Sequence, residues 1–209
     1  MNRTRVSVLL VEDHFMARLA LRSILNDRPD LLIAAETDNG PEAIRLYAKL
    51  RPDVTVMDLG LPGISGFDAI QAIRQQNRAA KIVVLTNYEG SEDVYRALRN
   101  GAMAYLTKDT SGQELVNAIL SVHQGVRYLP REVRDRVAER VPCAELTPRE
   151  QQVLQLISRG NSNREIAEAL EIAEKTVRIH VSSVLEKMGA RDRTQAAIYA
   201  IQRGFVHMD

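Results

Sequence analysis

Five short apolar runs, separated by amphipathic segments, constrain the fold of residues 5–124 more than any other feature of the sequence. The runs are Val6–Val11, Leu31–Ala35, Val54–Met57, Ile82–Leu85 and Met103–Leu106. Strands that are apolar on both sides of the pleat are typical of a parallel sheet buried between helices. Intervening segments such as 43–50 and 69–73 carry apolar residues at helical spacing. This alternation predicts an α/β domain with a doubly wound, five-stranded parallel sheet.

The sequence changes character after residue 124. Residues 125–145 are rich in arginine and contain Pro130 and Pro142, which indicates a linker, partly helical around Arg131–Arg140. After this segment, Thr147–Glu150 has the pattern of a capping box with proline at the first helical position. Ser162 with Glu165 indicates the start of the next helix. With the further start and stop signals, four short helices are predicted, with a tight second connection typical of a helix-turn-helix. We therefore expect domains at 1–124 and 146–209.

The bulk composition limits the classes of protein to be considered. The chain has 209 residues, of which 45% are hydrophobic and 26% charged, with a net charge of +1. No apolar run approaches the roughly 18 residues of a membrane helix, and the first run ends at Glu12–Asp13, too early for a secretory signal. We expect a cytoplasmic protein with no membrane partner. The lone Cys143 excludes an internal disulfide.

Charge gives no direct sign of nucleic-acid binding. Residues 146–209 hold nine Lys or Arg residues against eight Asp or Glu residues. DNA binding by this domain would therefore depend on where the charges lie rather than on their sum.

Polar side chains follow four of the predicted strands at their carboxyl ends. Glu12 and Asp13 follow the first strand, and Asp58, Thr86 and Lys108 follow the third, fourth and fifth. In open α/β sheets ligands bind outside this edge. Clustered carboxylates repel one another unless a cation neutralises them, and Mg²⁺ prefers carboxylate and water oxygens. Each residue taken singly has an ordinary structural explanation, as a helix cap or solvated surface, but their joint occurrence favours a site.

This set of groups is suited to phosphoryl transfer onto a carboxylate. Asp58 would be the nucleophile, since aspartyl-phosphates are known covalent intermediates. The metal and Lys108 would offset the charge of the phosphoryl oxygens, and Thr86 would hydrogen-bond one of them.

The helix predicted at about Glu174–Met188 has two distinct faces. Its apolar face comprises Val177, Val181, Val184, Leu185 and Met188, and its other face comprises Lys175, Arg178, Ile179, Ser182 and Glu186. An isoleucine among exposed polar residues is unusual for a solvated helix. It fits a surface that meets thymine methyl groups while Arg178 reaches guanine. The alternative is a basic surface helix with one stray apolar residue.

Residues 5–124 resemble the receiver domains of bacterial response regulators, which have a flavodoxin-like fold. The matching motifs are Val11–His14, Met57–Gly63, Leu85–Thr86 and Gly101–Lys108. The resemblance implies that Asp58 is the phosphoacceptor. It also implies that Asp13, Asp58 and the backbone carbonyl of Gly60 ligate Mg²⁺ or another divalent cation, with Glu12 acting nearby.

The same resemblance implies a switch. Thr86 and Tyr105 would rearrange on phosphorylation and alter the surface formed by the fourth helix, fifth strand and fifth helix. Asn87, Ala104 and Asp109 depart from the common receiver pattern, and none of these changes removes a catalytic group.

Residues 146–204 resemble the LuxR-type helix-turn-helix domain, and the whole chain resembles the NarL/LuxR class of response regulators. The matching residues are Leu146–Glu150, Gly160, Asn163, Glu165–Ala167, Leu170 and Lys175–Val177. The resemblance implies that the third helix enters the major groove of double-stranded DNA and that the fourth mediates a homodimer on DNA. Arg178, Ile179 and Ser182 would face the bases. Candidates near the phosphates are Ser162, Asn163, Lys175, Thr176 and Lys187.

The sequence thus predicts a transcriptional regulator that a sensor histidine kinase phosphorylates on Asp58. It is not expected to be an enzyme, beyond promoting its own phosphorylation and dephosphorylation. The alternative is a phosphorylation-independent regulator whose receiver is an interaction module. A phosphatase of the haloacid-dehalogenase type is disfavoured because Gly60 stands where a second acid is needed. A LuxR regulator that senses a small molecule is disfavoured because its ligand domain is not a receiver.

Overall fold

The computed structural model describes residues 5–138 and 146–207, which form two compact units. The first unit contains the strands β1 (Val6–Val11), β2 (Leu31–Thr37), β3 (Val54–Met57), β4 (Ile82–Thr86) and β5 (Ala104–Thr107). Its helices are α1 (Phe15–Asn26), α2 (Gly40–Leu50), α3 (Gly66–Gln76), α4 (Ser91–Arg99), α5 (Gly112–His123) and α6 (Arg131–Ala138). The second unit contains α7 (Pro148–Ser158), α8 (Asn163–Ala169), α9 (Glu174–Met188) and α10 (Arg193–Arg203).

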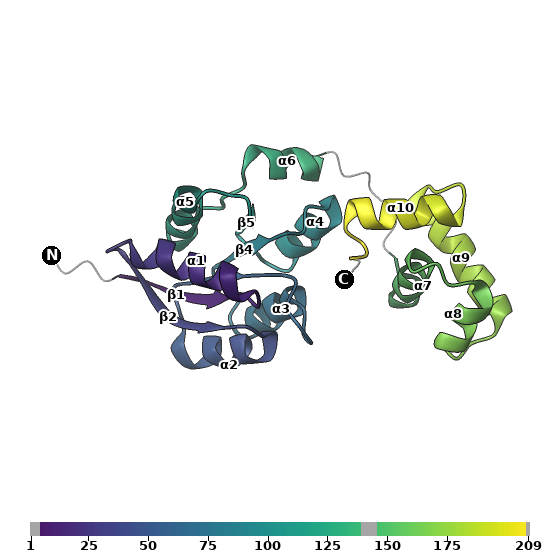
Figure 1. The fold of residues 1–209 in the computed structure, drawn as a ribbon, viewed down its shortest axis with the longest axis horizontal. Helices are drawn as coiled ribbons and strands as arrows, with labels where there is room; N and C mark the ends of the chain where they lie inside the picture. The colour runs from purple at the N-terminus through teal and green to yellow at the C-terminus, as the bar shows by residue number, and fades with distance from the viewer. Residues whose placement is uncertain (1–4, 139–145, 208–209) are drawn as a thin grey trace. The chain divides into compact units, whose positions relative to one another are not determined.

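The five strands form the predicted parallel sheet, in the order β2-β1-β3-β4-β5 (Figure 1). The chain moves from β1 outward to β2 and then returns past β1 to β3. Strand order therefore reverses between β1 and β3, and this reversal places a crevice at the carboxyl ends of these strands.

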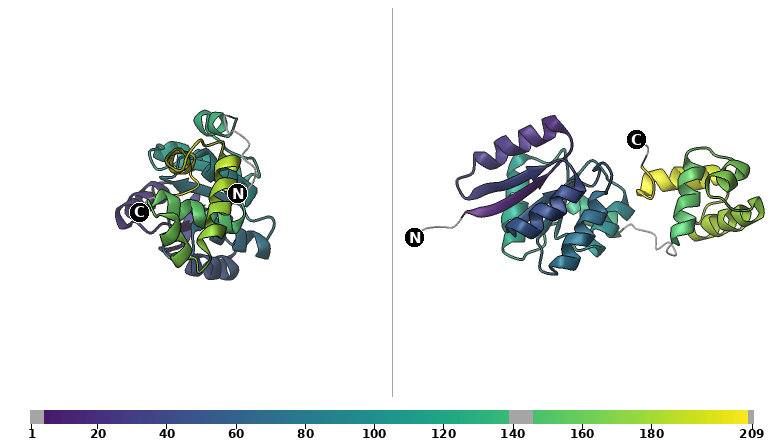
Figure 2. Two further views of the ribbon diagram at one scale, coloured as in Figure 1. Left: turned by 90° about the vertical axis from the view of Figure 1, so that its right-hand side faces the viewer. Right: turned by 90° about the horizontal axis from the view of Figure 1, so that it is seen from below.

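Helices cover both faces of the sheet, which is why its strands are apolar on both sides (Figures 1 and 2). Leu9 and Val11 of β1 belong to the core cluster that contains residues of α2, α3 and α4. Val8 and Leu10 belong to the cluster on the other face, with residues of α1 and α5. Burial of apolar surface contributes about 25 cal/mol of stability per Å², and this contribution on each face of the sheet stabilises the layered arrangement.

Strand β2 is longer than its apolar run. The run was predicted to end at Ala35, whereas the strand continues through Glu36 to Thr37 because Leu10 and Val11 of β1 pair with these residues. Backbone pairing at the edge of a sheet does not require an apolar side chain, so the hydrophobic pattern alone did not mark this end.

The chain stays attached to the sheet after α5. The backbone N–H of Tyr128 donates to the carbonyl of Met103 (3.0 Å), and Tyr128 forms a bridge with Ala104 of β5. The helix expected around residues 131–140 is present as α6, and the first compact unit continues to Val137. It thus extends past the predicted boundary at residue 124. The rest of the predicted linker, with Pro142 and Cys143, lies outside the described residues.

The helix starts of the second unit follow the predicted signals. Thr147 and Glu150 form a reciprocal capping box at α7, and Ser162 and Glu165 form another at α8. In the first unit the Ser111 side chain caps α5 by accepting a hydrogen bond from the N–H of Glu114 (3.2 Å). The Glu114 carboxylate instead accepts a hydrogen bond from the Tyr128 hydroxyl (3.3 Å).

Candidate functional site

The carboxyl ends of β1, β3, β4 and β5 bring the predicted polar side chains to one edge of the sheet. They line a pocket of about 310 Å³, whose walls comprise Asp13, His14, Ala17, Asp58, Gly60, Thr86, Asn87, Tyr88 and Lys108. Glu12 is not among the residues that line this pocket, but its Oε1 accepts a hydrogen bond from Nζ of Lys108 (2.8 Å). The convergence predicted from strand order is therefore present.

Asp58 is almost fully buried, with 4% of its surface exposed, and both its carboxylate oxygens accept hydrogen bonds. Oδ1 accepts from the backbone N–H of Leu59 (2.6 Å) and of Gly60 (3.2 Å). Oδ2 accepts from Nζ of Lys108 (2.6 Å). The loop after β3 folds back tightly here, and a Cβ on Gly66 would lie 2.0 Å from the Asp58 carbonyl oxygen. Glycine at position 66 therefore allows this loop to close around Asp58.

Lys108 links two buried carboxylates. Its Nζ lies 2.6 Å from Asp58 Oδ2 and 2.8 Å from Glu12 Oε1. Burial opposes the charged form of Lys108, but hydrogen bonds and charge attraction from both acids outweigh it and raise the pKa of the ammonium group. Burial, with repulsion from Asp58, raises the pKa of Glu12 despite its bond to Lys108.

Three carboxylates at this edge could hold a divalent metal. Glu12, Asp13 and Asp58 each offer an oxygen, and these oxygens all lie within 4.8 Å of one another. A single ammonium group, that of Lys108, contacts Glu12 and Asp58, so with all three acids ionised a net negative charge remains. A donor set of carboxylate oxygens with this charge fits a hard cation such as Mg²⁺. Gly60, predicted to add its carbonyl, also lines the pocket.

Thr86 and Tyr105 are joined through the backbone of one residue. The Thr86 hydroxyl accepts from the N–H of Tyr88 (3.3 Å), and the Tyr105 hydroxyl donates to the carbonyl of Tyr88 (2.8 Å). Tyr105 is fully buried. Sequence reasoning did not select Tyr88, although its position two residues after the end of β4 already placed it at the same edge of the sheet.

Helix α9 exposes the side chains predicted to face DNA. Lys175, Arg178 and Ser182 are exposed, and 63% of the surface of Ile179 is accessible. Val177, Val184 and Met188 are buried on the opposite face. Arg178 forms an ion pair with Glu174 one turn earlier (2.7 Å) on the exposed surface.

The predicted phosphate-contacting residues fall into different environments. Lys175 and Ser162 are exposed, whereas Asn163 and Thr176 are half-buried. Lys187 contacts both carboxylate oxygens of Glu150 (2.9 and 2.6 Å). Its ammonium group is thus bound within the domain, and a phosphate contact by Lys187, which stays a prediction, would have to compete with Glu150.

The contact with Lys187 strongly perturbs Glu150. Burial alone would raise the pKa of this carboxyl, but hydrogen bonds from Lys187, Ser183 and Thr147 outweigh burial and lower it to about 2. Glu150 therefore stays ionised at neutral pH and ties the start of α7 to the far end of α9.

Helix α10, predicted to mediate pairing on DNA, has a buried and an exposed face. Its small residues Ala196 and Ala200 lie in the core of the domain. Ile198 and Ile201, three positions apart, have 47% and 45% of their surfaces exposed. These two isoleucines leave an apolar face on the outside of the helix.

Comparison with known proteins agrees with this organisation. The family model described as "Response regulator receiver domain" matches residues 8–120, and "Bacterial regulatory proteins, luxR family" matches residues 144–200. The chain belongs to the response regulators with a receiver domain and a LuxR-type output domain, and it is a DNA-binding transcriptional regulator of the two-component class.

Individual relatives share this architecture over their whole length. The transcriptional regulatory protein LiaR of Bacillus subtilis strain 168 is 37% identical, over 97% of this chain and 100% of its own. The response regulator ChrA of a heme-sensing two-component system is 33% identical, with a TM-score of 0.58 over 97% of this chain and 99% of that one. The response regulator RcsB, in a complex with DNA, has a TM-score of 0.67 over 94% and 98% of the two chains, and at 23% identity it shows the fold alone.

Residues 5–138 and 146–207 contain no helix with the length and hydropathy of a membrane span.

The acidic cluster predicts a metal dependence of stability. Mg²⁺ should raise the unfolding temperature of the full-length protein, because a ligand that binds only the folded state stabilises it. Asp13→Asn replaces a charged carboxylate ligand by a neutral amide. The Mg²⁺ concentration needed for the same stabilisation should therefore rise roughly tenfold or more. Thermal unfolding over a MgCl₂ series measures both. Asp27 is exposed and lies just beyond the far end of α1, so Asp27→Asn is the matched control. Equal Mg²⁺ dependence in Asp13→Asn and wild type would contradict this metal site.

Proposed function

We propose that this regulator is controlled by phosphoryl transfer from a sensor histidine kinase to Asp58, with Mg²⁺ as the metal cofactor. The observation that carries the proposal is the buried Asp58 carboxylate, which is oriented by three hydrogen-bond donors and opens onto a pocket beside Lys108. A carboxylate held in one orientation presents its oxygen for attack in line with a leaving group, which lowers the entropic cost of the reaction.

In the transfer step an Asp58 oxygen attacks the phosphorus atom of a phosphohistidine on the kinase. The P–N bond breaks, its electron pair returns to the histidine nitrogen, and an aspartyl-phosphate forms. Lys108, which already contacts Asp58 Oδ2, would stabilise the charge on the phosphoryl oxygens, and the backbone N–H groups of Leu59 and Gly60 would hold Asp58 in place. A divalent cation bound by Glu12, Asp13 and Asp58 would neutralise the remaining negative charge.

Thr86 and Tyr105 would report the phosphoryl group to the rest of the receiver. Thr86 lines the pocket, and its hydroxyl would donate a hydrogen bond to a phosphoryl oxygen. Since Thr86 and Tyr105 both contact Tyr88, a shift at Thr86 would reach the buried Tyr105 through the backbone of Tyr88.

In the second domain, α9 would lie in the major groove of double-stranded DNA, with Arg178, Ile179 and Ser182 toward the bases. Contact between two copies through Ile198 and Ile201 of α10 would form a homodimer on DNA, and a symmetric dimer requires a pseudo-palindromic site. Binding to chromosomal DNA implies action in the cytoplasm.

The chain would not be an enzyme for an external substrate, because the phosphoryl group is transferred to its own Asp58 and later lost from it. The alternative, a receiver that acts as an interaction module without phosphorylation, has less support because Glu12, Asp13, Asp58, Thr86 and Lys108 are all present in one pocket region.

Treatment with a small-molecule phosphodonor and Mg²⁺ should add one phosphoryl group to the protein, on Asp58. The bond is an acyl phosphate, so the modification should be stable in acid and labile in base. Intact-mass and peptide mass spectrometry measure the number and position of the groups. Asp58→Asn should remain unmodified, and persistent phosphorylation of this variant at another residue would overturn the assignment.

Arg178→Ala should relax base preference and cost roughly 1–3 kcal/mol of binding free energy at the preferred site, as expected for loss of a good base contact. Lys175→Ala, exposed on the same helix, should instead weaken binding to all sequences similarly and reduce the salt dependence. Competition binding against a randomised DNA pool at two salt concentrations separates the two effects. An unchanged base preference in Arg178→Ala would refute its role in base recognition.

A further inference from the structure

Helix α6 is docked on the receiver through the same hydrophobic cluster that contains Tyr105. Val133 is 4% exposed and belongs to this cluster. Leu129 and Val137 are partly buried against it, as is Tyr88. The apolar side of α6 therefore packs on the same hydrophobic cluster as the two tyrosines.

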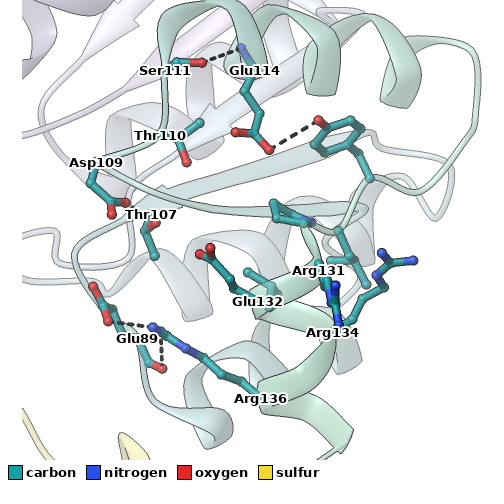
Figure 3. Close-up of a pocket in the computed structure, with 14 residues that line it drawn as sticks. Glu89, Thr107, Asp109, Thr110, Ser111, Glu114, Arg131, Glu132, Arg134 and Arg136 are labelled. Atoms are coloured by element: carbon teal, nitrogen blue, oxygen red, sulfur yellow. Dashed lines mark hydrogen bonds and ion pairs between the residues drawn. The ribbon is translucent and has the colours of Figure 1, made fainter.

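A polar contact joins α6 to the loop after β4. Nη1 of Arg136 donates to the carbonyl oxygen of Glu89 (2.8 Å), and Nη2 donates to Oε2 of the same residue (2.8 Å), as Figure 3 shows. Glu89 directly follows Tyr88, whose N–H and carbonyl are bound by Thr86 and Tyr105. A continuous series of contacts thus leads from the Asp58 pocket to α6.

The attachment of α6 is narrow. Beside these contacts, α6 borders a pocket of about 640 Å³ that separates part of the helix from the loop between β5 and α5. Polar side chains from both sides line it, among them Thr107, Asp109, Ser111, Glu132 and Arg134 (Figure 3). Arg131, Glu132, Arg134 and Asp135 of α6 are exposed. The helix is therefore held mainly by Val133, Val137 and Arg136.

Within the described residues, helix α6 comprises eight residues. Isolated helices shorter than about 12–15 residues are marginal in water. Once detached from the receiver, α6 would lose its helical hydrogen bonds, so its docking and its helical structure are coupled.

We propose that α6 is a latch that phosphorylation of Asp58 releases, an inference that rests on the function proposed above. In the structure the Thr86 hydroxyl accepts a hydrogen bond from the N–H of Tyr88. Rotation of the Thr86 side chain about its Cα–Cβ bond, which brings the hydroxyl to a phosphoryl oxygen, carries Oγ1 away from this N–H and breaks the bond. Residues 88–89 then shift, with the Tyr88 carbonyl still bound by Tyr105. Arg136 then loses the geometry of its two bonds to Glu89, and α6 leaves the surface and unfolds. The phosphoryl group shifts the equilibrium because it offers the Thr86 hydroxyl an acceptor that only the shifted side chain can reach.

Hydrogen–deuterium exchange of the intact protein tests the latch directly. Exchange of the amides of residues 134–138 should accelerate several-fold when the protein is treated with a small-molecule phosphodonor and Mg²⁺. Arg136→Gln should raise the same exchange about two- to fivefold without phosphorylation, as expected for loss of a partly exposed ion pair, and should reduce the further effect of the phosphodonor. Arg134→Gln, an exposed arginine on the same helix, is the matched control and should leave both values unchanged.

Intact mass measured on the same samples separates the possible failures. Absence of a phosphoryl group would overturn the proposed function, and in that case the Arg136→Gln arm still decides whether Arg136 holds α6. A phosphorylated protein in which exchange at residues 134–138 is unchanged or slower would overturn the latch while leaving phosphorylation at Asp58 intact. Equal exchange in Arg136→Gln, Arg134→Gln and wild type would show that the contact with Glu89 does not hold the helix.

Discussion

The receiver site depends on the ion pairs that the ammonium group of Lys108 forms with two buried carboxylates. This group joins the end of β5 to Asp58 after β3 and to Glu12 after β1. Burial of two like charges without a partner is costly, and breaking a buried ion pair by removing one partner typically costs about 3–5 kcal/mol. Lys108 therefore permits two acids to lie at the switch point of the sheet. Because Lys108 compensates only part of the negative charge of Glu12, Asp13 and Asp58, the site still favours a cation and can offer an anionic nucleophile.

The DNA-binding domain also pairs a buried acid with a lysine, and there the ion pair holds two helices together. Glu150 is buried and ionised, and Lys187 and Ser183 of α9 satisfy its oxygens. This contact fixes α9 against α7 from the inner side of the helix. The outer side is then free to expose Arg178 and Ile179, a pairing of charge and apolar surface that suits recognition of base edges.

Much of the fold and of the receiver site follows from local patterns. Apolar runs with helical segments between them predicted the parallel sheet, and strand ends predicted that Glu12, Asp13, Asp58, Thr86 and Lys108 converge. Capping boxes at Thr147 and Ser162 predicted helix starts that the structure confirms. The contacts that were not foreseen join residues far apart in sequence through side-chain geometry. No periodicity relates Arg136 to Glu89, or Lys187 to Glu150, and Tyr88 acts through its backbone, which residue type does not reveal. The docking of α6 was missed for the same reason, since its arginine-rich sequence is typical of a solvated linker.

We expect a phosphoryl group on Asp58 to change DNA binding through Thr86. The most direct measurement is the affinity of the full-length protein for a DNA site selected from genomic fragments, with and without phosphorylation, in wild type and Thr86→Ala. Loss of one hydroxyl should leave the extent of phosphorylation, read by intact mass, largely unchanged. Phosphorylation should tighten DNA binding by the wild-type protein, and this gain should be much smaller in Thr86→Ala. An equal phosphorylation-dependent gain in the two proteins would rule out this role of Thr86.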